Sequence, residues 1–180
     1  MNLGDNRITE IKDLDHLTNL KALYLHNNQI PEIKGLENLI KLENLSLSGN
    51  MIKEIKGLEN LTRLKTLGLG RNQITEIKGL KNLFNLKELY LLENKITEIQ
   101  GFENLTNLRK LNLRENNITK IKGFENLINL KKLTLTRNPI PQEIFEQLGG
   151  TTYYEVKHPQ RFVQYCQNIN ENENENAIEE

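Results

Sequence analysis

The side chains with the greatest chemical capacity in this chain are three histidines and one cysteine. His16, His26 and His158 can act as general bases or metal ligands, and Cys166 can act as a nucleophile. A structural zinc site gathers four such ligands, and pairs of them stand close together in the sequence. No two histidines form an H-x-x-x-H pair, and no second cysteine is present. The sequence therefore predicts no metal site and no cofactor.

Two further patterns resemble catalytic motifs only in composition. Gly68-Leu69-Gly70 is rich in glycine, but it lacks the strand and helix that flank a nucleotide-binding loop. Glutamates recur at positions 10, 32, 54, 76 and 98, and lysines follow two residues later at positions 12, 34, 56 and 78. Exposure does not raise the pKa of a carboxyl group as acid catalysis requires. We therefore expect a protein that is not an enzyme.

The dominant feature of the chain is a repeat. Seven asparagines recur every 22 residues: Asn6, Asn28, Asn50, Asn72, Asn94, Asn116 and Asn138. Apolar residues keep the same register, and one unit consists of Leu20, Leu23, Leu25, Asn28, Ile30, Ile33, Leu36 and Leu39. A period of roughly 20–29 residues with an L-x-x-L-x-L-x-x-N core is the signature of the leucine-rich repeat.

Each repeat is expected to form one coil of a solenoid, with its L-x-L stretch as a short strand stacked on its neighbours. The chain then turns through a buried corner, where unpaired backbone groups are costly. An asparagine there can satisfy these groups with its two donors and its acceptor. Glycines recur at positions 35, 57, 79, 101 and 123, and we expect a positive φ at this position.

Three segments are expected along the chain. Residues 1–139 form the solenoid, with about seven repeats of which the first is truncated. Residues 140–169 form a C-terminal cap with a short helix over 142–148, a strand over 151–156 and a second helix that starts near Pro159. Phe162, Val163 and Cys166 lie on one side of this helix, which predicts a buried thiol. Residues 170–180 alternate asparagine and glutamate and are expected to be acidic and disordered.

The period and the repeated I-x-x-I-x-G-[LF]-x-N-L half of each unit resemble one leucine-rich-repeat subfamily, typified by the regulatory subunit of the type-1 protein phosphatase. Internalins share this period. The resemblance covers residues 1 to about 140. It implies an α/β fold, a right-handed solenoid with a concave parallel sheet of six or seven strands, short 3₁₀ or α turns on the convex side and a C-terminal helical cap. Partners of this family usually dock on the concave face. The cap departs from the phosphatase-regulator pattern, so phosphatase binding is not carried over.

The residues between the leucines of each strand should point to the concave face, because side chains alternate along a strand. Ser46, Ser48, Gly68 and Gly70 form a shallow trough there, between large side chains on both sides. The candidate partner-binding residues are Tyr24, His26, Ser46, Arg71, Glu88, Tyr90, Leu92 and Arg114. The same positions also suit surface residues that folding simply leaves free to vary. We therefore expect a non-catalytic scaffold that binds a protein partner, whose identity the sequence does not give.

Two alternatives to this function remain open. The edge of the first coil is uncovered in the sequence, so two copies could pair there as a homodimer, or the chain could be part of a longer protein. A weak anion or nucleic-acid site could instead be formed by Lys110, Arg114, Lys132 and Arg137. Nucleic acid is the less favoured partner because 24 basic and 24 acidic residues leave no net charge. A single cysteine and the lack of an 18-residue apolar run favour a cytoplasmic protein with no membrane segment.

Overall fold

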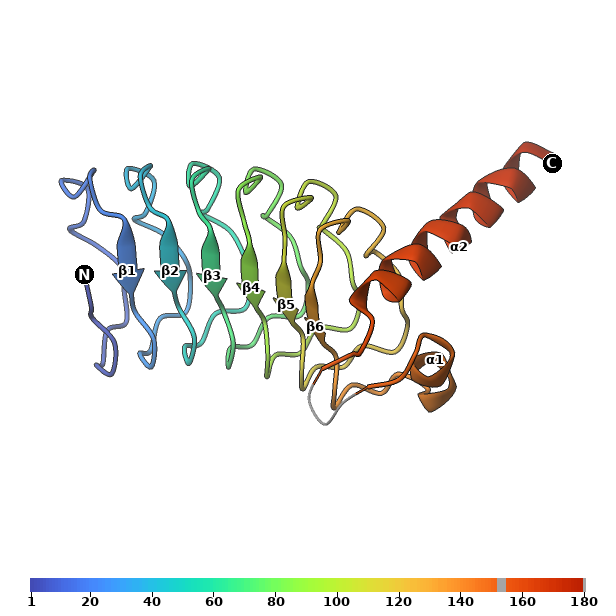
Figure 1. Ribbon diagram of the computed structural model, residues 1–180. Helices are drawn as coiled ribbons and strands as arrows, with labels where there is room; N and C mark the ends of the chain where they lie inside the picture. Colours follow the sequence, from blue (N-terminus) through green and yellow to red (C-terminus); the bar gives the residue numbers. More distant parts are fainter. Residues whose placement is uncertain (152–154, 180) are drawn as a thin grey trace.

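The computed structural model describes residues 1–151 and 155–179, with side chains described as far as Glu171. Within the described residues, six short strands form one parallel sheet in chain order (Figure 1). The strands are β1 (Ala22–Tyr24), β2 (Asn44–Ser46), β3 (Thr66–Gly68), β4 (Glu88–Tyr90), β5 (Lys110–Asn112) and β6 (Lys132–Thr134). Two helices follow, α1 (Gln142–Gln147) and α2 (Pro159–Glu179). This is the predicted right-handed solenoid, with the sheet on its concave face.

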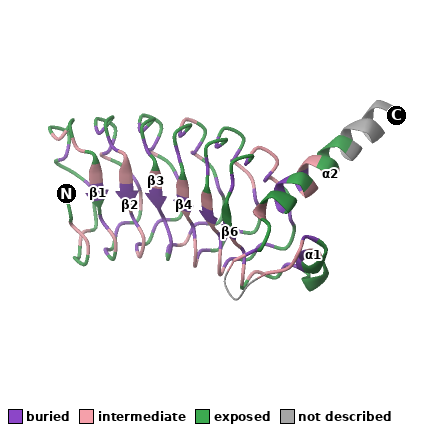
Figure 2. Ribbon diagram, viewed as in Figure 1, coloured by how far each residue is buried: buried purple, intermediate pink, exposed green. Residues whose placement is uncertain are grey.

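The register of the sheet follows the repeat without a shift. Leu23 pairs with Leu45, and every later central leucine pairs with the one 22 residues further on. These leucines are buried, and leucine and isoleucine make up most of the core of the coils. Buried segments recur from coil to coil (Figure 2). On the other side of β1, Leu3 donates its N–H to the carbonyl of Tyr24 at 2.7 Å, so the first coil continues the sheet.

The recurring asparagines link each coil to the preceding one. Asn72 donates from Nδ2 to the carbonyls of Leu47 and Leu69, both at 3.0 Å. Its Oδ1 accepts the N–H of Ile52 at 3.0 Å. Leu47 and Ile52 belong to the preceding coil, so one buried side chain satisfies polar groups of two coils. The same three contacts recur at Asn28, Asn50, Asn94 and Asn116.

The glycine column has the predicted backbone conformation. Gly79 has a φ of +74°, and a Cβ atom there would collide with the carbonyl oxygen of Ile55 in the preceding coil. The turn that follows is held by hydrogen bonds three residues apart, such as Leu83 N–H to the carbonyl of Leu80 at 3.0 Å. Such bonds are those of a single 3₁₀ turn, and the glycine allows the coils to approach closely on the convex side.

The last coil is covered by the two helices. Phe162, Val163 and Cys166 of α2 are buried, and the ring of Phe162 lies 6.1 Å from that of Phe145 on α1. Gln160 of α2 donates to the carbonyl of Leu130 at 2.6 Å. The expected burial of the Cys166 thiol is confirmed. Beyond these contacts α2 runs away from the coils (Figure 1).

Two expectations concern this region. The strand expected over residues 151–156 lies in part outside the described residues, which omit 152–154, and Thr151 and Val156 form an antiparallel bridge with each other. Val156 also donates its N–H to the carbonyl of Leu133 at 3.0 Å. Residues 170–179 were expected to be disordered, yet α2 continues to Glu179. A helix that is already nucleated gains one hydrogen bond for each further residue, so composition alone underestimated its length.

Replacing one interior asparagine should destabilise the whole stack. Asn72→Leu removes a donor to two carbonyls and the acceptor for Ile52, and the stranded buried groups should lower the free energy of unfolding by about 1–3 kcal/mol. Chemical denaturation measures this change. Asn117→Leu, at an exposed asparagine of the next-but-one coil, is the control and should change it by less than about 0.5 kcal/mol. Equal effects of the two substitutions would contradict the stabilising role of the buried asparagines.

Removing the central side chain of the cap should loosen the last coil first. Phe162→Ala deletes a fully buried ring and should lower the free energy of unfolding by about 3–5 kcal/mol. Amide exchange should speed up at Leu133 and Leu135 more than at Leu45, because each coil contacts only its neighbours. The exposed Gln164→Ala on the same helix is the control. Uniform loss of protection along the chain would show that the cap does not act locally.

Candidate partner-binding surface

The strand pairings place the outward residues of successive coils in columns on the concave face. Ala22, Asn44, Thr66, Glu88, Lys110 and Lys132 form the first column, and Tyr24, Ser46, Gly68, Tyr90, Asn112 and Thr134 form the second. A third column follows the ends of the strands and includes His26, Ser48, Gly70, Leu92 and Arg114. The structure thus brings the predicted candidate residues onto one face, although Arg71 lies at its edge.

A hollow of about 370 Å³ lies on this face between β1 and β4. Tyr24 bounds it on one side, and Tyr90 and Leu92 bound it on the other. Ser46 and Gly68 contribute to its floor. Tyr24 is 40% exposed, whereas Tyr90 is half-buried. The structure therefore has a hollow where the trough was predicted, with a tyrosine on each side, although Gly70 does not line it.

The two glycines of the trough have different effects on its shape. A Cβ atom on Gly68 would lie 3.2 Å from the Ser48 hydroxyl oxygen, so this position is nearly filled by its neighbours. A Cβ atom on Gly70 would collide with the side chain of Leu92. Leu92 therefore leans across Gly70 towards the preceding coil. Because Gly70 has no side chain, Leu92 has space to form one side of the hollow.

Tyr90 is held in place from two sides. Its hydroxyl donates to Glu88 Oε2 at 2.6 Å, and the Lys110 ammonium nitrogen lies 5.0 Å from the centroid of its ring. Burial, and then the hydrogen bond to Glu88, raises the pKa of the Tyr90 phenol. A side chain that is already fixed loses little conformational freedom when a partner binds it. Glu88, a predicted contact residue, also supports Tyr90.

His26 is held on the N-terminal side of the hollow. Its Nε2 lies 3.2 Å from Asp5 Oδ2, and the imidazole ring lies over Gly4, where a Cβ atom would collide with it. Asp5 also accepts a hydrogen bond from Asn27 at 2.8 Å. This hydrogen bond, and then the proximity of His26, holds the pKa of the Asp5 carboxyl below its ordinary value. His26 thus belongs to the surface with its ring orientation set.

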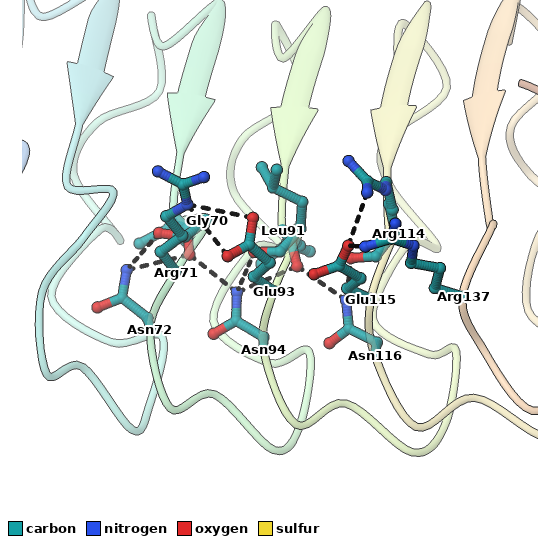
Figure 3. A network of polar contacts seen from close by, with 12 residues as sticks. Gly70, Arg71, Asn72, Leu91, Glu93, Asn94, Arg114, Glu115, Asn116 and Arg137 are labelled. Carbon is teal, nitrogen blue, oxygen red and sulfur yellow. Dashed lines mark hydrogen bonds and ion pairs between the residues drawn. The ribbon is translucent and has the colours of Figure 1, made fainter. Parts of the chain in front are cut away.

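An ion-paired ladder runs along the C-terminal ends of the strands (Figure 3). Arg71 Nε lies 3.1 Å from both carboxylate oxygens of Glu93 in the next coil. Glu115 pairs with Arg137 and, at 2.7 Å, with Arg114. Arg71, Glu93, Glu115 and Arg137 all have φ between 53° and 60°. Arg71 and Arg114, which we predicted as contact residues, thus belong to this ladder.

Sequence reasoning missed the positive φ at the repeat position that Arg71, Glu93, Glu115 and Arg137 share. We had predicted a positive φ only at the glycines of the convex side. One signal was available: Gly49 and Asn27 occupy the same repeat position as Arg71, and these two residue types tolerate the left-handed region. A second missed pattern is an outer asparagine series, in which Asn85 donates to the carbonyl of Thr62 at 2.8 Å.

The four cations of the alternative anion site are engaged with other groups. Lys110 covers the ring of Tyr90, and Lys132 lies 3.8 Å from Glu155. Arg114 and Arg137 share Glu115. An anion would have to compete with these contacts, so the arrangement does not favour this set of residues as an anion site.

The described part of the chain offers little for catalysis. No group of three or more metal-ligating side chains gathers within it. Cys166 lies under the cap, where burial raises the pKa of its thiol to about 11, so the reactive thiolate is disfavoured at neutral pH. In that same part, no helix combines the length and the apolar character needed to cross a bilayer.

Comparison with known families identifies the repeat. A model of leucine-rich repeats in two copies matches residues 1–38 and 40–82, and a second leucine-rich-repeat model matches residues 63–118 and 84–140. The chain belongs to the leucine-rich-repeat family. This family is generally a non-catalytic interaction module. No curated protein sequence matches the chain significantly.

Solved structures of other leucine-rich-repeat proteins share the fold. Internalin C2 of Listeria monocytogenes is 37% identical with a TM-score of 0.73, over 77% of this chain and 62% of its own. A second internalin of that species, inlF, is 35% identical with a TM-score of 0.66, over 71% of this chain and 38% of its own. A leucine-rich-repeat protein of Leptospira interrogans is 34% identical with a TM-score of 0.74, over 82% of this chain and 39% of its own. This chain therefore spans less than two thirds of each of these proteins.

Removing the charge beside Tyr90 should change its titration. In Glu88→Gln the acceptor is weaker and no negative charge opposes the phenolate, so the pKa of Tyr90 should fall below that in the unsubstituted protein. Carbon NMR of the labelled tyrosine ring against pH measures it. Glu93→Gln, which removes a carboxylate paired with Arg71 instead, is the control and should leave this titration unchanged. An unchanged Tyr90 titration in Glu88→Gln would contradict the hydrogen bond.

Proposed function

We propose that this leucine-rich-repeat protein is a scaffold that binds a protein partner on its concave face. The observation that carries the proposal is the hollow between β1 and β4. It lies over four neighbouring strands of a sheet whose backbone is fixed by the buried asparagines. A partner side chain that enters it would contact Tyr24, Tyr90 and Leu92 over a floor of small residues.

The residue types of the hollow support this assignment. Tyrosine contributes a large contact area with few rotatable bonds and is enriched where interfaces concentrate their binding energy. Tyr90 is already oriented by Glu88 and Lys110, so its ordering costs little on binding. The internalin neighbours and the family are consistent with an interaction module. The 22-residue period also supports our placement of the chain in the subfamily of the phosphatase regulator.

Two further features of the sequence stay predictions. Pairing of two copies along the edge strand at Asn2 should make the mass measured by sedimentation equilibrium rise with concentration. A cytoplasmic location, expected from the single cysteine, is measured by cell fractionation.

The partner and its site can be identified in one experiment. Tagged protein is used to capture partners from the source cells, and the bait is compared with Tyr24→Ala/Tyr90→Ala by quantitative mass spectrometry. A true partner should be lost with this variant and should bind it at least tenfold more weakly in vitro, which corresponds to about 1.4 kcal/mol. The circular dichroism spectrum should be unchanged, because neither ring is part of the core.

Phe84→Ala/Ile128→Ala is the matched control, because both residues are large and exposed but lie away from the hollow. It should retain the partner. A partner that is retained by the Tyr24→Ala/Tyr90→Ala bait and lost by the control bait would place the binding site outside the hollow.

A further inference from the structure

The N-terminal ends of β4, β5 and β6 carry a row of three cations for which no ion pair is found among the described residues. Lys87, Arg109 and Lys131 each directly precede a strand, and all three are exposed. Their coils are stacked by main-chain hydrogen bonds, since Arg109 donates its N–H to the carbonyl of Lys87 at 2.8 Å and Lys131 donates to that of Arg109 at 2.9 Å. The backbones of these three basic residues therefore stack one coil apart, at a spacing of about 4.8 Å.

Two more lysines, which already contact Tyr90 and Glu155, lie beside this row and complete a basic ridge. The ridge consists of Lys87, Arg109, Lys110, Lys131 and Lys132. Lys110 and Lys132 are paired partners in the sheet register and begin β5 and β6. Among the described residues, no carboxylate forms an ion pair with Lys87, Arg109 or Lys131. The carboxylates near the ridge are Glu88, whose Oε2 accepts from Tyr90, and Glu155, which pairs with Lys132.

Two other charged columns of the solenoid contain ion pairs. On the convex side, Lys34 lies 3.0 Å from Glu10 and 3.2 Å from Glu32, so it bridges two coils. The ladder at the C-terminal ends of the strands pairs arginine with glutamate in the same way. Stacked like charges repel one another. The stacked cations of the basic ridge repel one another, and a negatively charged ligand would relieve this repulsion.

The ridge adjoins the hollow. Lys110 belongs to the ridge, and its ammonium group lies over the ring of Tyr90, which forms a wall of the hollow. One ligand can therefore contact both surfaces. We propose that the basic ridge binds an acidic segment of the protein partner, next to the part of the partner that occupies the hollow. This inference rests on the proposed function, which it extends by naming the chemistry of the partner.

A protein segment fits the ridge better than a nucleic acid does. Single-stranded nucleic acids are bound by basic grooves combined with aromatic rings on which bases stack. No aromatic residue lies in the ridge, and the neighbouring ring of Tyr90 is covered by Lys110. An extended acidic segment with carboxylates on alternate residues presents them about 6.6 Å apart on one face, within reach of flexible lysine side chains.

The probe for this proposal is a labelled peptide of alternating glutamate and serine, with a glutamine-for-glutamate peptide as its neutral counterpart. Binding is followed by fluorescence polarisation at low and at physiological ionic strength, because salt screens exposed charges. The ridge variant is Lys87→Gln/Arg109→Gln/Lys131→Gln. The control is Lys53→Gln/Lys95→Gln/Lys120→Gln, which removes the same charge from exposed lysines elsewhere on the coils.

We expect the glutamate peptide to bind the unsubstituted protein and the control variant within threefold of each other, and to bind the ridge variant at least tenfold more weakly. Equal affinity for the ridge and control variants, or for the glutamine peptide, would overturn the proposal. Tighter, ridge-dependent binding of oligothymidylate would overturn it in favour of a nucleic acid. The peptide does not need the hollow. If the Tyr24→Ala/Tyr90→Ala bait loses the partner but the peptide test fails, the ridge alone is rejected. If that bait keeps the partner and the peptide test succeeds, the hollow alone is rejected.

Discussion

The buried asparagine at the corner of each coil is the interaction on which the rest of the molecule depends. In Asn72 and its equivalents, one side chain satisfies backbone groups of two successive coils in an interior otherwise filled by leucine and isoleucine. A shift of one residue would strand these groups and turn the strand leucines outward, so register is tightly specified. The coils then stack with main-chain hydrogen bonds on both sides of the corner, and the sheet has little freedom to deform.

That rigidity frees the concave face from any role in folding. The central leucine of each strand is committed to the core, whereas the residues beside it are held at fixed spacing and can differ from coil to coil. The result is a face with distinct parts. Tyr24 and Tyr90 enclose the hollow, Arg71 and Glu93 belong to a neutralised edge, and Lys87 and Arg109 belong to an uncompensated one. A partner with an apolar side chain beside acidic residues would match this arrangement.

The fold could be predicted from the sequence because the pattern is redundant: every coil repeats the same leucines, asparagine and glycine in the same places. Residues outside the repeat were harder. The extent of α2 beyond Asn170 depends on a helix nucleated against the last coil, which composition does not reveal. The position of Tyr24 and Tyr90 around a trough followed from strand alternation alone. The pairing of Arg71 with Glu93, and the leaning of Leu92 over Gly70, depend on side-chain directions that no periodicity encodes.

The most direct test of this account is a crystal structure of the protein bound to the partner that it captures. We expect that a partner side chain fills the hollow between Tyr24 and Tyr90, that the coils keep their register, and that partner carboxylates lie against Lys87 and Arg109. An interface formed on the convex side, around Lys34 and Lys56, with the hollow left open to solvent, would contradict it.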